Sequence, residues 1–371
     1  MSTPTRLTTF PMHGQHKLSH EGYRTRDGHY IEWFGQLLDG RGSVSVRSRP
    51  EPMVLRPTFR TGTVARNTHP TDSWSWRLPS AGPRQRWWWT SRDSYSGRDL
   101  DPAVPVVAWN PFLGVSNLWD GIARGRQKVA FDMLDDWTNH YAFEPIHAEV
   151  TQAYRRVFER ADIVTANSEA TLATARDFGR SDAVLVTNGC DPERFDTTST
   201  ARGPVTVGYV GKIGKRVDLD LVLRVSAAFS DVSFVFAGPI LDREYDAPLR
   251  AQPNIRLLGD VHYRRVPELL QTFDIGWVPH RVGEGEVGGD VIKTYEYRAA
   301  GLPVVTTPVL GASDRGLDGV RVSDRSAQVD AFGELIAGRP RVPRELPTIP
   351  PATTWRHKAV DLLDRLGVAH G

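Results

Sequence analysis

The chain has 371 residues, which is enough for two domains that each bury a core of their own. Its 46 lysines and arginines against 44 aspartates and glutamates give a net charge of +2, which excludes a polycation that binds nucleic acid with its whole surface. A hydrophobic content of 40% with 24% charged residues is typical of a soluble globular protein, and the single cysteine, Cys190, excludes an internal disulfide and a cysteine-based zinc site.

Strand and helix patterns alternate along most of the chain. Short apolar runs predict strands at residues 7–11, 104–109, 128–131, 163–166, 183–186, 205–210, 232–236, 255–257, 275–278 and 304–306. Amphipathic stretches between and after them predict helices at residues 146–160, 168–178, 218–229, 266–273, 290–300, 327–337 and 354–366. This alternation predicts an α/β protein with parallel sheets built from right-handed βαβ units.

Two segments interrupt the alternation. Residues 196–204 are polar, lack periodicity and end in Gly-Pro, which predicts a hinge between domains. Residues 339–351 are rich in proline and precede the last expected helix. We therefore expect a first domain at residues 1–196, a second at 197–345 and a terminal helical segment at 346–371.

A glycine-rich run leads into the helix expected at residues 290–300. Asp290 can cap that helix, whose free backbone N–H groups and positive dipole end then face one spot, as is typical of a diphosphate site. Lys293 and Glu296 share a helix face, so a cation suited to phosphate and a carboxylate suited to sugar or ribose hydroxyls can act on one ligand. The alternative is an exposed helical ion pair beside a loop.

A second glycine turn follows the strand expected at residues 205–210. Glycines such as Gly211 let the backbone approach a phosphate closely, and Lys212, Lys215 and Arg216 supply positive charge. The first βα loop of an α/β domain lies at the carboxyl ends of the strands, where ligands bind. The alternative is a tight turn with a solvated basic rim.

The string K-x-x-E-Y-x-A-A-G-x-P-V-V at residues 293–305 resembles the donor-binding signature of nucleotide-sugar glycosyltransferases of the GT-B fold, in the retaining group around glycosyltransferase family four. Residues 159–169 and 187–195 resemble the envelope-polysaccharide branch of that group. The resemblance implies two Rossmann-like domains that face a cleft. The first would hold the acceptor and the second the nucleotide-sugar, with a C-terminal helix that crosses back to the first domain.

The resemblance also implies roles for single residues. Glu296 would hold the nucleotide ribose, and Arg216 and Lys293 would stabilise the leaving diphosphate. The donor-binding residues that it implies are Gly14, Gly211, Lys212, His280, Gly288, Gly289, Asp290, Val291 and Glu296. Most members carry a further glutamate near the sugar at the position of Gly288, and here Glu284 and Glu286 lie just upstream. This departure leaves the choice between retention, which the group implies, and inversion open.

The loop after the first expected strand is dense in polar residues. We expect Asp27 and His29 from this loop to act near the sugar. Four histidines lie within it, but their spacing lacks a zinc signature, and the residues concerned are His13, His16, His20 and His29. We therefore expect no metal and no cofactor, with the nucleotide-diphosphate sugar as co-substrate.

Three carboxylates follow the strand expected at residues 128–131. At the carboxyl end of a strand such groups can bind an acceptor hydroxyl or act as its base. We take Asp135 as a candidate base and Asp136 as a candidate acceptor contact. The alternative is structural, with Asp132 capping a turn and Asp136 beginning a helix.

Five tryptophans are interleaved with arginines in one part of the first domain, and they are Trp74, Trp76, Trp87, Trp88 and Trp89. Such a cluster suits stacking on sugar rings, lipid headgroups or nucleobases. Trp88 and Arg86 are therefore candidate acceptor contacts. The alternative, which we favour for residues 87–89, is a β-rich edge whose tryptophans enter the core.

The resemblance, together with these patterns, implies an enzyme that transfers a sugar from a nucleotide-diphosphate sugar to a hydroxyl of a glycan, lipid carrier or small molecule. The alternatives are glycosylation of a modified base in DNA, a sugar epimerase of the same fold, and an inactive sugar-nucleotide-binding protein. The first residues lack the apolar segment of a signal peptide, and no run reaches the roughly 20 apolar residues that span a bilayer. We expect a cytoplasmic protein with at most peripheral membrane contact.

Overall fold

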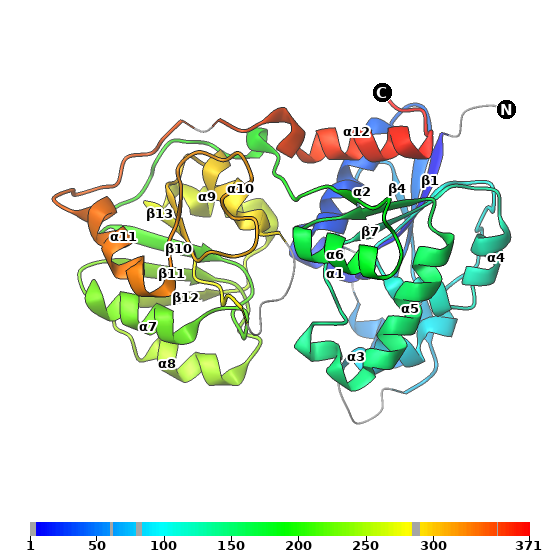
Figure 1. The fold of residues 1–371 in the computed structure, drawn as a ribbon, viewed down its shortest axis with the longest axis horizontal. Coiled ribbons are helices and arrows are strands. Elements are labelled where there is room, and N and C mark those ends of the chain that lie inside the picture. Colours follow the sequence, from blue (N-terminus) through cyan, green and yellow to red (C-terminus); the bar gives the residue numbers. More distant parts are fainter. Residues whose placement is uncertain (1–4, 60–61, 79–83, 284–289, 347) are drawn as a thin grey trace. The chain divides into compact units, whose positions relative to one another are not determined.

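The computed structural model describes residues 5–59, 62–78, 84–283, 290–346 and 348–371. The chain divides into two compact units (Figure 1). The first contains Met1–Thr187 and Trp355–Gly371, and the second contains Asn188–Thr354. Among the described residues, none of the helices combines the length and the apolar character that crossing a bilayer requires.

The first unit is built on a seven-stranded parallel sheet in the order β4-β2-β1-β6-β7-β8-β9. Its strands are β1 (Arg6–Phe10), β2 (Ser43–Arg47), β4 (Thr68–Thr71), β6 (Val106–Ala108), β7 (Val129–Met133), β8 (Ile163–Ala166) and β9 (Val184–Leu185). A separate parallel pair consists of β3 (Glu51–Pro52) and β5 (Trp74–Ser75). All five residues of β7 are buried, as expected for a central strand covered on both faces.

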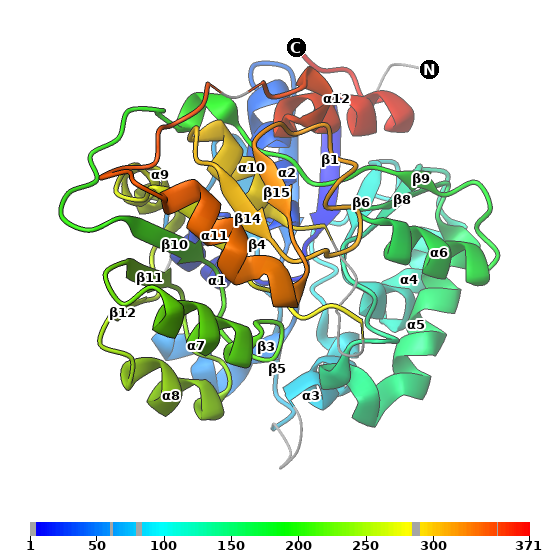
Figure 2. The ribbon, with the colours of Figure 1, turned by 60° about the vertical axis from the view of Figure 1, so that its left-hand side comes forward.

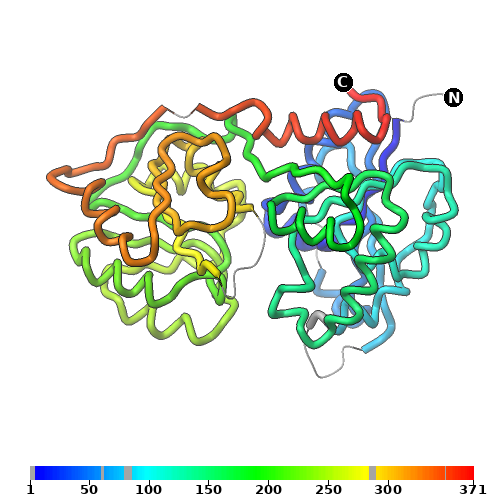
Figure 3. The backbone as a smooth tube through the Cα atoms, viewed as in Figure 1, coloured from blue at the N-terminus to red at the C-terminus, as the bar shows by residue number. Residues whose placement is uncertain are grey.

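Helices cover this sheet. They are α1 (Gln15–Glu21), α2 (Arg26–Leu37), α3 (Arg84–Thr90), α4 (Trp119–Arg124), α5 (His147–Arg160), α6 (Glu169–Asp177) and α12 (Trp355–Leu366). The long helix α5 buries one stripe at helical spacing, which consists of Val150, Ala153, Tyr154, Val157 and Phe158. The C-terminal helix α12 packs on α2, so the expected return of the chain to the first unit is confirmed (Figures 1 and 3).

The second unit is built on a six-stranded parallel sheet in the order β12-β11-β10-β13-β14-β15. Its strands are β10 (Thr206–Val210), β11 (Ser233–Ala237), β12 (Ile255–Gly259), β13 (Ile275–Val278), β14 (Val304–Thr306) and β15 (Val320–Val322). Its helices are α7 (Leu219–Ala228), α8 (Asp246–Arg250), α9 (Val266–Gln271), α10 (Ile292–Ala299) and α11 (Gln328–Ile336). In both sheets the chain starts in the middle, winds outward and then reverses, which is the doubly wound Rossmann order.

Alternating side chains of the second sheet enter two different cores. Phe234 and Phe236 belong to a cluster with residues of α7 and α11, whereas Val235 belongs to a cluster with residues of α9 and α10. Figure 2 shows these helix pairs on their respective sides of the sheet. Because successive residues of a strand point to opposite faces, one apolar run fills both layers.

The structure confirms the predicted α/β class with parallel sheets. The strands expected at 163–166, 275–278 and 304–306 coincide with β8, β13 and β14. The β-rich edge expected around the tryptophans is wrong, because residues 84–90 form the helix α3.

The polar segment at residues 196–204 lies within the second unit. Arg341 donates hydrogen bonds to the carbonyls of Gly203 (2.6 Å) and Pro204 (3.0 Å), and the N–H of Thr200 donates to the carbonyl of Gln271 (2.9 Å). These bonds hold the segment on the second unit, and the chain passes between the units after Thr187 and after Thr354.

Candidate functional site

The candidate site of the second unit lies at the carboxyl ends of β10 and β13. These strands are neighbours, and the chain leaves them in opposite directions along the sheet. In open parallel sheets such a reversal opens a crevice in which ligands bind. The glycine turn after β10 and the helix α10 after β13 both begin at this edge.

The helix α10 begins and ends through local backbone signals. Val291 occupies the N-cap position without a side-chain cap, and Gly301 follows the helix with a φ of +74°. A left-handed conformation there is typical of a glycine that ends a helix. Gly288 and Gly289, like Glu284 and Glu286, lie outside the described residues.

Asp290 does not cap α10, so that prediction is wrong. Its carboxylate accepts hydrogen bonds from the N–H of Asn188 (2.7 Å) and the hydroxyl of Tyr295 (2.6 Å), and it forms an ion pair with Arg315 (2.9 Å). These partners come from three parts of the second unit. Asp290 therefore fixes the segment that enters α10 rather than its first turn of N–H groups.

Lys293 lies against the glycine turn. Its Nζ is 5.1 Å from the centroid of the Tyr209 ring. A Cβ at Gly211 would lie 2.9 Å from Cε of Lys293, and Gly211 has a φ of +152°, a conformation that residues with side chains rarely adopt. Although part of Lys293 reaches solvent, burial and the nearby charge of Arg216 lower the pKa of its ammonium group to about 7.

Glu296 is buried, with 5% of its surface exposed. Its Oε1 accepts a hydrogen bond of 2.7 Å from the hydroxyl of Tyr263. Burial raises the pKa of the Glu296 carboxyl to about 7, against the lowering effects of that hydrogen bond and of Lys293. This burial excludes the interpretation of Lys293 and Glu296 as an exposed ion pair.

The buried carboxyl of Glu296 should make the free energy of unfolding depend on pH. The native state keeps its proton up to pH about 7, whereas an unfolded chain releases it near 4.5, so the native state binds more protons between these values and loses stability as pH rises. As pH rises through this window, the free energy of unfolding of wild type should fall by up to about 3 kcal/mol relative to that of E296Q. Above the window the difference between the two proteins should stay constant. Urea titrations at several pH values measure the difference. Glu268 is exposed on α9 and gives the control E268Q; equal profiles for E296Q and wild type would contradict the buried acid.

His280 lies directly after the same edge of the sheet. It is buried, and desolvation together with the charges of Lys293 and Arg216 lowers its pKa well below the ordinary value. A neutral imidazole is therefore expected beside two cations, where it can accept a hydrogen bond. Lys212 and Arg216 are exposed on the glycine turn, and the carbonyl of Arg216 accepts a 2.8 Å hydrogen bond from the N–H of Arg281.

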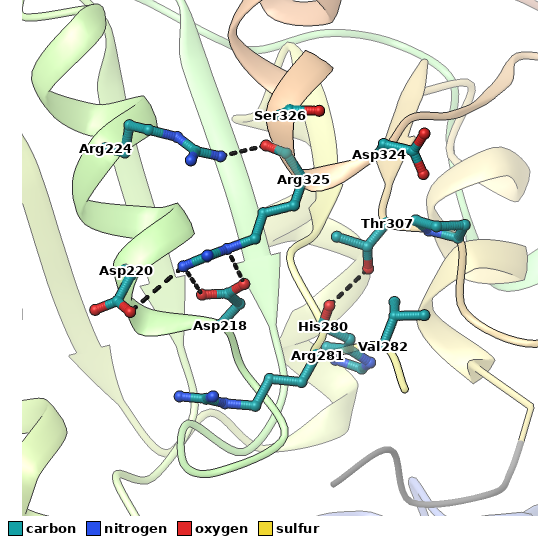
Figure 4. Close-up of a pocket in the computed structure, with 11 residues that line it drawn as sticks. Asp218, Asp220, Arg224, His280, Arg281, Val282, Thr307, Asp324, Arg325 and Ser326 are labelled. Atoms are coloured by element: carbon teal, nitrogen blue, oxygen red, sulfur yellow. Dashed lines mark hydrogen bonds and ion pairs between the residues drawn. The ribbon is translucent and has the colours of Figure 1, made fainter. Parts of the chain in front are cut away.

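A cavity of about 670 Å³ opens beside these residues (Figure 4). Its lining consists of Asp218, Asp220, Arg224, His280, Arg281, Val282, Thr307, Pro308, Asp324, Arg325 and Ser326. Figure 4 shows Arg325 reaching Asp218 and Asp220, with ion-pair distances of 2.7 and 3.4 Å. His280 is both an expected donor-binding residue and a lining residue of this cavity, so the predicted donor site and the cavity meet at the end of β13.

The structure places Asp27 and His29 in the interior of the first unit. Asp27 accepts hydrogen bonds from the N–H of Met12 (2.9 Å) and the hydroxyl of Thr25 (2.5 Å), and burial raises its pKa. The ring of His29 stacks on Trp355 of α12 at 4.8 Å between centroids. Both side chains thus hold α2 to its neighbours, and we do not carry them into the proposed site.

Gly14 lines a second, smaller cavity of about 280 Å³ in the first unit. The other lining residues are His16, Lys17, His20, Glu51, Leu55 and Phe59. Gly14 is the N-cap of α1, and a Cβ there would meet Ser48 at 3.6 Å, which is ordinary contact. Among the described residues no group of acidic, histidine or cysteine side chains is arranged to hold a metal ion.

The carboxylates after β7 have different surroundings. Asp136 accepts hydrogen bonds from the backbone and hydroxyl of Thr138, from Asn139 (2.7 Å) and from Thr174 (2.7 Å). These donors saturate its oxygens, which favours the structural alternative, although it begins a turn rather than a helix. Asp135 is partly exposed, and its carbonyl accepts from the hydroxyl of Tyr154.

The tryptophans of α3 pack inward. Trp88 contacts Trp137 and Phe143 at 5.7 and 5.6 Å between centroids, and the guanidinium of Arg49 covers its ring at 4.1 Å. Trp87 is buried, Trp88 and Trp89 are partly buried, and Arg86 is exposed. The interpretation of residues 87–89 as core is confirmed for Trp87, while Trp88 and Trp89 pack against the core and keep part of their surface exposed.

The sequence analysis did not identify the residues of other elements that contact Lys293 and Glu296. Tyr263, which bonds Glu296, and Tyr209, which underlies Lys293, come from other elements than α10. Tyr263 follows the Leu-Gly-Asp-Val segment that begins at the end of β12, and its place near this glycine is the one local signal that marked it. Asp132 and its partner Arg26 were also missed as a pair.

Comparison with known proteins identifies the fold. Residues 204–337 match the sequence model of the family described as Glycosyl transferases group 1. A sucrose-phosphate synthase from Thermosynechococcus elongatus has a TM-score of 0.68 at 14% identity, over 98% of this chain and 96% of its own. The fold is GT-B. HepE of Anabaena, solved in complex with UDP and glucose, has a TM-score of 0.60 at 13% identity over 96% of this chain and 94% of its own.

One curated relative adds a sequence match. The putative teichuronic acid biosynthesis glycosyltransferase TuaH of Bacillus subtilis strain 168 is 25% identical over 240 residues. The match covers 56% of this chain and 58% of TuaH, so the chain spans less than two thirds of that relative. Together with the matched group 1 domain in the second unit, these findings confirm the resemblance to GT-B glycosyltransferases.

Proposed function

We propose that this chain is a glycosyltransferase that moves a sugar from a nucleotide-diphosphate sugar to an acceptor hydroxyl. The observation that carries the proposal is the pair formed by a buried acid, Glu296, and a cation, Lys293, on one helix at the reversal point of a Rossmann-like sheet. Both residues lie within the segment that matches the group 1 family. HepE of Anabaena, which has the same fold, was solved with UDP and glucose bound, and this supports a uridine nucleotide as the first donor to test.

In the proposed reaction the bond between the sugar and the diphosphate breaks, and the bond from the sugar to the acceptor oxygen forms. Negative charge builds on the departing phosphate oxygen, and Lys293 and Arg216 stabilise it. The charge of Arg216 disfavours the charged form of Lys293, so an anionic diphosphate between them relieves this repulsion. Glu296 accepts from the ribose hydroxyls, and the acceptor hydroxyl gives its proton to a base or to the leaving phosphate.

The acceptor in this proposal is a glycan, a lipid carrier or a small molecule held by the first unit, and transfer proceeds with retention. The name of TuaH, which places it in teichuronic acid synthesis, supports a glycan. Glycosylation of DNA is the alternative that the cluster of tryptophans and arginines supports, and that support weakens because Trp87 is buried and Trp88 packs against the core.

Calorimetry with UDP, GDP, ADP and TDP tests the donor site directly. We expect at least one nucleotide to bind, and Glu296→Ala to weaken its binding because the ribose hydroxyls lose their acceptor. Glu268→Ala, on the exposed face of α9, is the matched control and should bind like wild type. Absence of binding by all four nucleotides at millimolar concentration would exclude the proposal. Nucleotide binding without transfer of sugar from the corresponding nucleotide-sugar to candidate acceptors would indicate an inactive binding protein.

A further inference from the structure

Large apolar side chains are exposed on one part of the first unit. Trp76 and Leu78 have 81% and 73% of their surface exposed, and Val54 and Leu55 have 59% and 42%. Among the described residues of this unit, these are four of the five exposed large hydrophobic side chains, the other being Tyr141. Single exposed apolar residues are ordinary, but a cluster of them marks an interaction surface.

The two segments that carry these side chains lie side by side. Strands β3 and β5 pair in parallel, with Pro52 opposite Ser75 (Figure 2). The 3-10 helix η1 (Met53–Thr58) and residues 76–78 therefore leave the same end of this pair. Rings from both segments meet, since Phe59 and Trp74 lie 5.4 Å apart between centroids, and the guanidinium carbon of Arg56 lies 5.9 Å from the Trp74 ring.

The same surface is positively charged. Arg56 and Arg77 stand among the apolar residues, and residues 53–59 and 74–78 contain no aspartate or glutamate. Neither arginine forms an ion pair with any residue that the structure describes. We call these six residues the basic apolar surface, and they are Val54, Leu55, Arg56, Trp76, Arg77 and Leu78.

We propose that the basic apolar surface binds the face of an anionic lipid bilayer. Tryptophan and leucine side chains gain free energy when they enter the boundary between headgroups and acyl chains, and tryptophan favours this depth because its ring is amphipathic. Arginines beside them meet lipid phosphates at the level of the headgroups. A surface whose six residues include two cations and no acid fits a sheet of negative charge over hydrocarbon better than it fits a neutral protein face.

The neighbouring cavity extends this fit. Leu55 lines it together with Lys17, His16, His20 and Glu51, so the apolar surface continues into a recess that carries an ammonium group, two imidazoles and one carboxylate, which Arg49 pairs at 2.7 Å. The ammonium group and the imidazoles can pair with phosphate oxygens. A headgroup in the recess would then leave its acyl chains along Leu55 and Val54.

Co-sedimentation with vesicles tests the surface. We expect the full chain to bind vesicles of phosphatidylcholine with phosphatidylglycerol, and to bind pure phosphatidylcholine weakly. Charge reversal in R56E/R77E should lower the partition onto anionic vesicles at least about tenfold, because each surface cation contributes to attraction by anionic lipid. W76S/L78S should lower binding to a similar degree, and higher salt should weaken binding of wild type while the charge-reversed variant changes little.

The second unit supplies a matched control. Leu346 is 85% exposed and Arg339 is exposed in the same unit, so L346S/R339E makes one apolar and one charge change of the same kinds away from the basic apolar surface. This control should bind vesicles like wild type, and melting curves should show that all three variants fold, since the changed side chains are exposed.

Several outcomes would overturn the proposal. Wild type that ignores anionic vesicles excludes it, and so does a control that loses as much binding as the surface variants. Conversion of a dimer to a monomer by W76S/L78S, without vesicle binding, would assign the surface to a second copy of the chain. Binding of single-stranded DNA that R56E/R77E abolishes, again without vesicle binding, would assign it to nucleic acid. Because nucleotide binding by the second unit is measured separately, these results do not depend on the proposed transferase activity.

Discussion

Replacement of Lys293 by methionine is expected to lower turnover about 100-fold to 1,000-fold, which corresponds to roughly 2.7–4 kcal/mol of lost transition-state stabilisation. The ammonium group is held at the turn after β10 by Tyr209 and Gly211 and does not need to move when charge develops on the leaving diphosphate. Methionine keeps most of the volume but supplies no charge. We expect Arg216→Ala to lower turnover for the same reason. Release of nucleoside diphosphate under saturating donor measures both effects.

Arg250 offers the control for these variants. It is exposed on α8 of the same unit, so Arg250→Met removes one positive charge away from the glycine turn. We expect its turnover to stay within a few-fold of wild type. Because burial lowers the pKa of Lys293 to about 7, donor binding should take up a proton above that pH, and donor affinity should fall as pH rises. If turnover of Lys293→Met equals that of the control variant, Lys293 has no part in the proposed mechanism.

Replacement of Asp132 by alanine is expected to destabilise the first unit by about 3–5 kcal/mol, because it leaves a buried charge without its partner. Arg26 has 2% of its side chain exposed and donates to both oxygens of Asp132, at 2.7 and 2.9 Å. Trp109 Nε1 and the hydroxyl of Thr165 donate to the same carboxylate at 2.6 Å each. Removal of the carboxylate therefore strands these two donors as well as the guanidinium. Urea unfolding followed by far-ultraviolet circular dichroism measures the loss.

The double variant R26M/D132L separates the charge from the packing. It removes both partners and replaces them by apolar side chains of similar length, which is often neutral for buried ion pairs. We expect it to recover the part of the stability that Asp132→Ala loses through the unpaired guanidinium, while Trp109 and Thr165 still lack their acceptor. Surface pairs provide the comparison, and Arg156→Ala, whose partner Asp120 is exposed, should cost less than about 1 kcal/mol. If Asp132→Ala also costs less than about 1 kcal/mol, the hydrogen bonds and ion pair of Asp132 contribute little to stability.

The role of Glu296 illustrates how local sequence and tertiary structure divide the information. The spacing of Lys293 and Glu296 predicts that they share a helix, and α10 confirms it. The same spacing is compatible with an exposed ion pair. Burial of Glu296 and its bond to Tyr263, which lies 33 residues away, decide against that alternative.

Periodicity and apolar runs determined the class of the protein, the positions of most of its strands and helices, and the two glycine-linked segments of the candidate site. These features depend on residues within a few positions of one another, and so local patterns carry them. Tertiary structure decided the partners of Asp290, the inward packing of Trp87 and Trp88, and the bond between Arg26 and Asp132 across 106 residues. Such contacts form only when the sheet brings distant segments together, because burial and pairing are properties of the folded surroundings rather than of the residue itself.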